Sequence, residues 1–143
     1  MRVSQNGIDF IKQKEGVGLT EYLDSAGKPT IGVGHRIKIG EKFPHILTMQ
    51  EVDDLLRNDL SKVEAVVNEY VEVKIDQNQF DALCSLTFNI GNSAFITSTF
   101  LKLLNKGEIL KTADAMLHWD RIGNTTSSGL LRRRRSEATL FLS

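Results

Sequence analysis

The sequence has only one cysteine and three histidines among its 143 residues. A single cysteine excludes an intramolecular disulfide, and Cys84 stands in the apolar run DALCSLTF, where we expect a buried and unreactive thiol. The histidines and the cysteine do not have the spacing of a zinc site. We therefore expect neither a metal ion nor another cofactor.

Long apolar segments are also missing. No apolar run approaches the roughly 20 residues that span a bilayer, and the N-terminal sequence MRVSQNGIDF lacks the apolar core of a secretory signal peptide. We therefore expect a protein that is made and kept in the cytoplasm, with no signal peptide and no membrane anchor. The contents of 41% hydrophobic and 25% charged residues are typical of a globular protein, and the length fits one domain.

Charge of one sign is not in excess, because the formal net charge is zero. The run Arg132, Arg133, Arg134 and Arg135 suggests a nucleic-acid site, but consecutive helical residues point about 100° apart and form no single basic face. A pI near 6.8 is also unlike that of a nucleic-acid-binding domain. We expect no nucleic acid as partner. At least one of these arginines should turn inward and pair with a carboxylate, for which Glu15 is a candidate.

One stretch, residues 14–35 (KEGVGLTEYLDSAGKPTIGVGH), concentrates candidate functional groups. It holds Glu15, Asp24 nine residues later and Thr30 six residues after that, together with five of the eleven glycines. Glycines clustered around acidic and hydroxyl side chains indicate a tightly turned backbone that carries a site. An ordinary exposed hairpin with solvated acids is the alternative.

The local pattern suggests how these groups are placed. Residues 5–15 predict a helix that Gly16 ends, so that Glu15 lies at the negative end of the helix dipole, which disfavours its ionised form as a general acid requires. Residues 25–29 predict a turn between two extended arms, which would bring Asp24 and Thr30 to adjacent positions across a hairpin. Gly32 and Gly34 indicate a bulge or a close backbone approach.

The remaining pattern is mainly helical. A third strand is predicted at 36–39, and the capping box at 48–51 opens a helix of about 22 residues. Further helices are predicted over 77–90, 99–106, 109–119 and from about 130, with a polar loop at 123–129. We predict an α+β, mainly α, class in one folding unit. Its lobes would be a β-rich lobe at about 12–47, a connecting helix at about 48–72, and a helical lobe of 73–143 plus 1–11.

Two further side chains can be interpreted from their positions. His35 has no second metal ligand near it in sequence, so we expect a buried or half-buried ion pair, with Asp59 on the long helix as the candidate partner. Trp119 has helical spacing and is expected in the core rather than in a sugar-stacking site.

Three segments in this order resemble the phage-type lysozymes of glycoside hydrolase family 24. Glu15, Asp24 and the segment TIGVGH at 30–35 match the family's acidic and threonine motif. QNQFDALCSLTFNIGNSAF at 77–95 is similar to the start of the family's C-terminal lobe, and RRRRSEATLF at 132–141 to its end. The resemblance covers essentially the whole chain. It implies a lysozyme-like fold of two lobes, with a small hairpin or three-stranded sheet, a long connecting helix and an all-helical C-terminal lobe.

The resemblance also implies the activity of an endolysin, which hydrolyses the β-1,4 bond between N-acetylmuramic acid and N-acetylglucosamine in peptidoglycan and so lyses the bacterial cell. Glu15 would be the acid, Asp24 would stay ionised, and Asp24 with Thr30 would hold the attacking water. This is an inverting division of labour, although the sequence leaves the stereochemistry open. Phe88 and Asn89 would line the cleft between the lobes, and one of the four arginines would pair with Glu15.

The family needs no metal, and the implied enzyme is a monomer that waits in the cytoplasm of the host bacterium until a separate holin releases it to the cell wall. Two alternatives remain open. A lytic transglycosylase would use one acid and leave Asp24 and Thr30 without a role. A catalytically silent wall-binding module of the same fold would not need any of the three residues.

Overall fold

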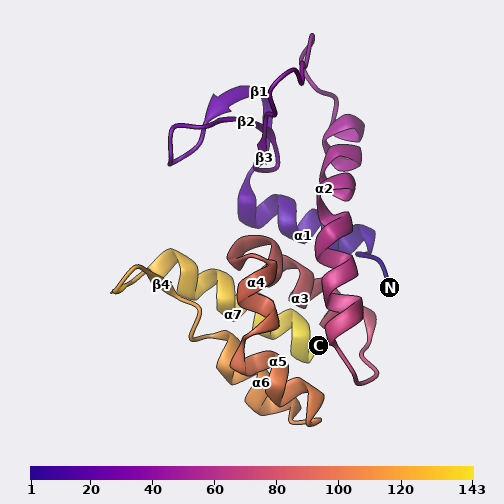
Figure 1. The fold of residues 1–143 in the computed structure, drawn as a ribbon, viewed down its shortest axis with the longest axis vertical. Helices are drawn as coiled ribbons and strands as arrows, with labels where there is room; N and C mark the ends of the chain where they lie inside the picture. The colour runs from indigo at the N-terminus through magenta and orange to yellow at the C-terminus, as the bar shows by residue number, and fades with distance from the viewer. The chain divides into compact units, whose positions relative to one another are not determined.

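The computed structural model describes residues 1–143, most of which lie in helices (Figure 1). The chain divides into two compact units, one of residues 8–61 and the other of residues 1–7 together with 62–143. A small antiparallel sheet lies in the first unit, and the second unit is mainly helical. The predicted α+β, mainly α, class is confirmed.

The sheet of the first unit has three strands in the order β1 (Gly18–Leu23), β2 (Pro29–Gly32) and β3 (His35–Arg36). Figure 1 shows the β1–β2 hairpin with its turn. Strand β3 ends at Arg36 instead of continuing to residue 39 as predicted. The chain turns there because Glu41 N donates to Lys38 O at 3.0 Å, and Ile39 points fully into solvent.

Helix α1 (Gln5–Glu15) has the predicted bounds. Ser4 caps it, since the Ser4 Oγ accepts a hydrogen bond of 3.0 Å from Gly7 N. The helix ends because Gly16 adopts a φ of +80°, and its N–H donates to Lys12 O at 2.8 Å. This positive φ fixes Glu15 as the last helical residue.

Helix α2 (Met49–Tyr70) has 22 residues and begins with the predicted capping box. Glu51 N donates to Thr48 Oγ1 at 3.1 Å, and Thr48 N donates to Glu51 Oε1 at 3.0 Å. Gly32 lets β2 approach the helix, because a Cβ there would lie 3.2 Å from Leu55 Cδ2. The core of the first unit combines buried side chains of the helix with those of β2 and the residues after it: Val52, Leu56, Leu60, Ile31 and Val33.

The second unit contains five further helices: α3 (Gln77–Ile90), α4 (Asn92–Ile96), α5 (Thr99–Asn105), α6 (Ile109–Met116) and α7 (Ser128–Leu142). Helix α7 packs along α3, and α5 packs against α6. The predicted capping pair of Asp76 and Gln79 opens α3, and Ser98 caps α5. The shared core is largely aromatic and aliphatic, and its fully buried members include Phe80, Leu83, Phe95, Phe100 and Phe141.

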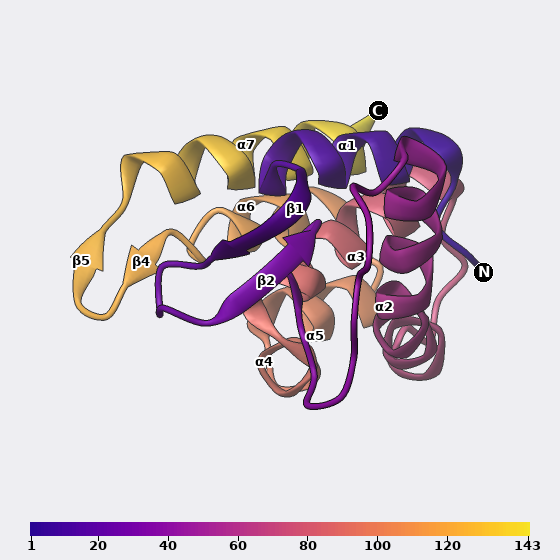
Figure 2. The same ribbon diagram turned by 90° about the horizontal axis from the view of Figure 1, so that it is seen from above.

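Three predictions in this unit need correction. The short helix α4 was not predicted, because it follows α3 directly after Gly91. Helix α6 ends at Met116, three residues before the predicted end at 119. The polar segment predicted as a loop contains a hairpin of β4 (Arg121–Ile122) and β5 (Thr125–Thr126) just before α7 (Figure 2). Helix α7 then begins at Ser128, where Ser127 Oγ accepts from Leu130 N at 3.2 Å.

Cys84 is fully buried on α3, as predicted. Burial raises the pKa of its thiol well above the ordinary value, and the nearby carboxylates of Glu64 and Asp81 act in the same direction. The thiol is therefore protonated and unreactive. None of the helices combines the length and the apolar character that a membrane span requires.

Candidate functional site

The side chain of Glu15 stands at the C-terminal end of α1 and is half-buried. Its position follows from the helix stop at Gly16, whose positive φ makes Glu15 the last helical residue. The last turn of α1 also carries Lys12, whose Nζ lies 2.8 Å from Asp53 Oδ1 on α2. The structure therefore places Glu15 at the negative end of the helix dipole, as predicted.

Asp24 follows β1 and organises the turn of the hairpin. Its Oδ1 accepts hydrogen bonds of 2.9 Å from the backbone N–H groups of Ala26 and Lys28. The Lys28 N–H is the main cause that lowers the pKa of Asp24 below its ordinary value of 3.8; partial desolvation opposes it, and Ala26 and Arg36 add to the lowering. The carboxyl group is therefore ionised at neutral pH.

Thr30 is buried on β2, with 1% of its surface exposed. Its hydroxyl donates to Lys28 O at 2.8 Å. The prediction that Thr30 and Asp24 are direct neighbours across the turn is wrong, because the cross-strand partner of Thr30 on β1 is Tyr22. Asp24 and Thr30 are linked instead through one acceptor, since Asp24 N also donates to Lys28 O, at 3.0 Å.

Arg36 belongs to this cluster and was not predicted. It pairs with Thr30 in the β2–β3 ladder, and its Nε lies 3.2 Å from Asp24 Oδ2. The side chain is mostly exposed. The sequence carried a weak signal for it, because a third strand that follows the hairpin must place one of its residues beside Thr30.

His35 on β3 confirms the predicted ion pair and adds a second carboxylate. Its Nδ1 lies 2.7 Å from Asp59 Oδ2 on α2, and its Nε2 lies 2.8 Å from Glu41 Oε1 in the following loop. Burial lowers the pKa of His35, but the hydrogen bonds that the ring makes to the Glu41 and Asp59 carboxylates, and their charges, outweigh it and raise the pKa above the ordinary value of 6.5. The ring thus holds the loop and the helix to the sheet.

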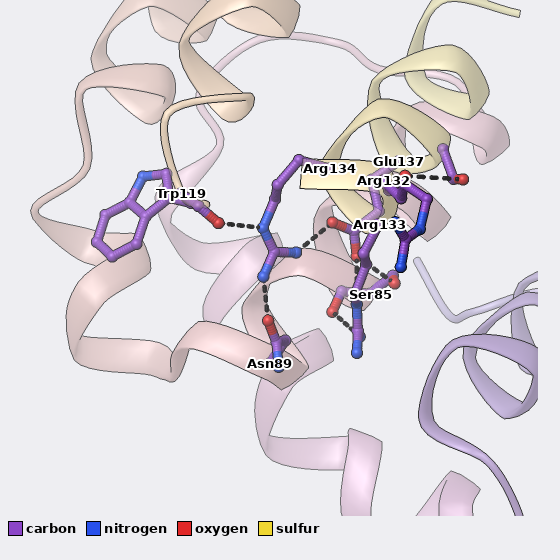
Figure 3. Close-up of polar contacts among 8 residues, drawn as sticks. Ser85, Asn89, Trp119, Arg132, Arg133, Arg134 and Glu137 are labelled. Atoms are coloured by element: carbon purple, nitrogen blue, oxygen red, sulfur yellow. Dashed lines mark hydrogen bonds and ion pairs between the residues drawn. The ribbon is translucent and has the colours of Figure 1, made fainter. Parts of the chain in front are cut away.

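The arginine run lies on α7, and two of its members turn inward, in agreement with the prediction (Figure 3). Arg133 and Arg134 are buried and both pair with Glu137 on the same helix. The sequence interpretation missed this carboxylate, although Glu137 lies three and four residues from the two arginines, the spacing of neighbours on a helix face. The pairing of Glu15 with an arginine stays a prediction.

Phe88 and Asn89 lie in the last turn of α3. Asn89 lines a pocket of about 690 Å³ within the second unit, with lining residues that include Trp119, Arg121, Leu130 and Arg134. Its Oδ1 accepts a hydrogen bond from Arg134 Nη2. Phe88 is half-buried and does not line that pocket. Trp119, predicted in the core, is half-buried and forms part of the pocket wall.

No group of three or more His, Cys, Asp or Glu side chains is arranged to hold a metal ion. The chemistry that the residues offer is that of carboxyl, hydroxyl and amide groups. Glu15, Asp24 and Thr30 all come from the unit of residues 8–61, and Asn89 comes from the other unit.

Comparison with known proteins places the chain in a family. Residues 12–137 match the family model described as phage lysozyme. The endolysin of Salmonella phage P22 is 47% identical over 146 residues, with 100% of this chain and 99% of that protein covered. The endolysin of Acyrthosiphon pisum secondary endosymbiont phage 1 is 38% identical, with 99% and 98% covered.

The fold agrees with this assignment. The crystal structure of a P22 lysozyme mutant superposes with a TM-score of 0.92 at 45% sequence identity, and the match covers 100% of this chain and 99% of that one. The resemblance to family 24 lysozymes and the predicted lysozyme-like fold are thereby confirmed. The chain belongs to the phage lysozyme family.

Proposed function

We propose that the chain hydrolyses the β-1,4 bond between N-acetylmuramic acid and N-acetylglucosamine in peptidoglycan, with Glu15, Asp24 and Thr30 as its catalytic residues. Membership of the phage lysozyme family makes the chain a lysozyme-type glycoside hydrolase, and its full-length likeness to endolysins makes peptidoglycan the substrate. The surroundings of each residue support the role that it takes in this proposal.

The observation that carries the assignment is the environment of Asp24. Two backbone N–H groups and the Arg36 guanidinium donate to its carboxylate, and these donors stabilise the ionised form. A carboxylate that stays charged can face the positive charge that develops on the sugar ring and can accept a proton from water. Because an ionised Asp24 has no proton to give, another carboxyl group must act as the general acid.

Glu15 supplies that acid. It is the last residue of α1, and its side chain is half-buried. Glu15 protonates the glycosidic oxygen as the bond to the leaving sugar breaks. Water then adds to the anomeric carbon, and its proton passes to Asp24.

Thr30 positions that water together with Asp24. Its hydroxyl hydrogen is directed to Lys28 O, so the hydroxyl oxygen presents its lone pairs to a water molecule as an acceptor. Burial of Thr30 in the sheet holds this oxygen in one orientation. His35 and Asp59 support the arrangement, because they hold β3 and the α2 helix together.

Phe88 and Asn89 bind the glycan in this proposal, with Asn89 as a hydrogen-bonding residue at the pocket of the second unit. The chain acts as a monomer and as one folding domain over residues 1–143, with the lobes at 12–47 and 73–143 plus 1–11 and the connecting helix at 48–72. It remains in the host cytoplasm until a holin admits it to the wall.

Clearing of a suspension of chloroform-treated Gram-negative cells tests the assignment. Glu15→Gln should abolish clearing, Asp24→Ala should be nearly as damaging, and Thr30→Ala should clear at a clearly reduced rate. Circular dichroism should show a native helix content for each. Clearing by Glu15→Gln at the wild-type rate would refute the catalytic role of Glu15. A wild type that fails to clear the cells, as Glu15→Gln is expected to, would support a silent wall-binding module.

Mass spectrometry of the digest distinguishes the hydrolase from a lytic transglycosylase. Hydrolysis leaves reducing muramic acid ends, whereas a transglycosylase closes a 1,6-anhydro ring without water. The bonded surroundings of Asp24 and Thr30 favour the hydrolase, since the other mechanism would leave both without a role. Mainly anhydro ends would reject the water-positioning role of both residues.

A further inference from the structure

The guanidinium of Arg134 is hydrogen-bonded through all three of its nitrogens. Only 1% of the residue is exposed. The group donates to Trp119 O at 2.7 Å through Nε, to Glu137 Oε1 through Nη1 and to Asn89 Oδ1 through Nη2 (Figure 3). It therefore joins the last turn of α3, the chain after α6 and its own helix α7.

Glu137 fixes this guanidinium in place. The carboxylate is fully buried and pairs with both Arg133 and Arg134. Ser85 Oγ donates to its Oε2 at 2.6 Å, and Arg133 Nη2 donates to Ser85 O at 3.1 Å. A planar guanidinium held at three sides cannot rotate without breaking a buried charge-assisted hydrogen bond, so its donor to Asn89 has a fixed direction.

This contact decides the orientation of the Asn89 amide. A guanidinium has donors and no acceptor, so the side of the amide that faces Arg134 must be the oxygen. The Asn89 Nδ2 then faces away from the guanidinium, with its N–H groups available at a residue that lines the pocket of about 690 Å³. None of the residues that line that pocket carries a carboxylate.

We propose that Arg134 is a positioning residue, which orients the Asn89 amide so that Nδ2 donates to an acceptor oxygen of the bound glycan strand. The inference rests on the proposed function for the identity of the ligand. It goes further because it assigns Asn89 the role of a donor and assigns Arg134 a role that acts only through Asn89.

The sharpest test is Asn89→Asp. An aspartate is nearly isosteric and can still accept from Arg134, but it replaces the N–H donor with a second acceptor oxygen. If Asn89 only accepts the hydrogen bond from Arg134, Asn89→Asp should leave ligand binding unchanged. If Asn89 also donates to the ligand, Asn89→Asp should weaken ligand binding while the stability of the protein stays the same.

Binding is measured in a Glu15→Gln background, so that the result does not depend on turnover. The probe is a soluble peptidoglycan strand without stem peptides, and the readout is the fluorescence of Trp119, the only tryptophan. We expect Asn89→Asp to raise the Kd about threefold to tenfold, the factor of one lost hydrogen bond. An unchanged Kd would overturn the proposal, even where the clearing assay had established that the chain hydrolyses peptidoglycan.

Two additions separate the proposed role from simpler causes. Repeating the titration at about 1 M salt screens charge repulsion by the new carboxylate, and a Kd effect that disappears there would count against the lost donor. Arg134→Lys keeps the charge opposite Glu137 but not the planar fork. It should raise the Kd by a similar factor, with no further rise when it is combined with Asn89→Asp.

Additive effects of Arg134→Lys and Asn89→Asp would show that Arg134 does not act through Asn89, and would overturn the positioning role. Lys102→Met, which removes an exposed charge from α5 of the same unit, is the matched control and should leave the Kd at the value of the background protein. Thermal unfolding of each variant confirms that the compared proteins are folded.

Discussion

Arg36 Nε lies 3.2 Å from Asp24 Oδ2, so a residue on the third strand contacts the carboxylate that follows the first. The contact favours the ionised form of Asp24, in addition to the larger effect of the Lys28 N–H. Because the folded-state pKa of Asp24 is lowered, the charged carboxylate is present above that pKa and is lost as the pH falls through it.

Arg36→Gln should therefore move the acid limb of the pH profile of kcat/KM to higher pH. The shift should be smaller than a complete return to the ordinary pKa of Asp24, since the backbone donors remain. Lys42→Gln, on the exposed loop that follows, is the control. An acid limb that stays in place in Arg36→Gln would show that another group governs it.

The hydroxyl of Thr30 should matter for activity more than for stability. Thr30→Val keeps the shape of the side chain but loses the hydrogen bond to Lys28 O, at a cost of about 1 kcal/mol in the free energy of unfolding. If the hydroxyl positions the attacking water, kcat should fall by at least roughly tenfold. Thr30→Ser should restore most of it. Equal kcat values for the valine and serine variants would exclude the role.

The pairing of His35 with two carboxylates should make stability depend on pH. Its pKa is raised on folding, so its stabilisation is fully present below about pH 6.5 and is lost as the pH rises through the folded-state pKa. The lowered pKa of Glu41, caused first by the Lys38 N–H and then by His35, gives a contribution that is lost as the pH falls. Stability should be greatest between these limits.

Urea unfolding of the wild type and His35→Gln from about pH 4.5 to about pH 9 checks this dependence. The difference between the two proteins should be largest near about pH 5 to 6.5 and should shrink toward about pH 9. His45→Gln removes a more exposed histidine that pairs with Glu51 and should change the free energy of unfolding little at any pH. A difference between wild type and His35→Gln that grows with pH would contradict the raised pKa of His35.

Glu137→Gln should destabilise the chain strongly. The substitution leaves Arg133 and Arg134 without this counter-ion in a buried setting, and such losses cost about 3–5 kcal/mol. Glu108→Gln, which breaks an exposed pair with Lys111, should change the free energy of unfolding by no more than about 0.5 kcal/mol. Similar losses for the two variants in urea titrations would show that the cluster is not strongly coupled.

Local signals predicted most elements of the fold. The bounds of α1, the capping box at Thr48 and the capping pair at Asp76 depend on neighbouring residues alone, so they could be predicted from the sequence. The hairpin at 121–126 and the short helix α4 could not, because their sequences are polar or short and lack a repeated apolar pattern.

The site residues that belong to one sequence motif could be predicted. Contacts between residues from separate segments of the chain were harder to predict. The pairing of His35 with Asp59, 24 positions away, was predicted, but the contact of His35 with Glu41 was not. Glu41 lies in a short irregular loop, which has no repeating pattern to indicate which of its side chains faces His35. The register of the hairpin also differed from the prediction, since Leu23 pairs with Pro29 and therefore places Tyr22 opposite Thr30.

The atom that joins Asp24 to Thr30 is the main-chain carbonyl oxygen of Lys28. The Lys28 side chain is exposed and takes no part in the link. Position 28 should therefore tolerate most residues in a library selected for lysis. Proline is the exception, since it lacks the N–H group that donates to Asp24 Oδ1. A position whose side chain can vary thus holds two candidate catalytic residues in place through its main-chain atoms alone.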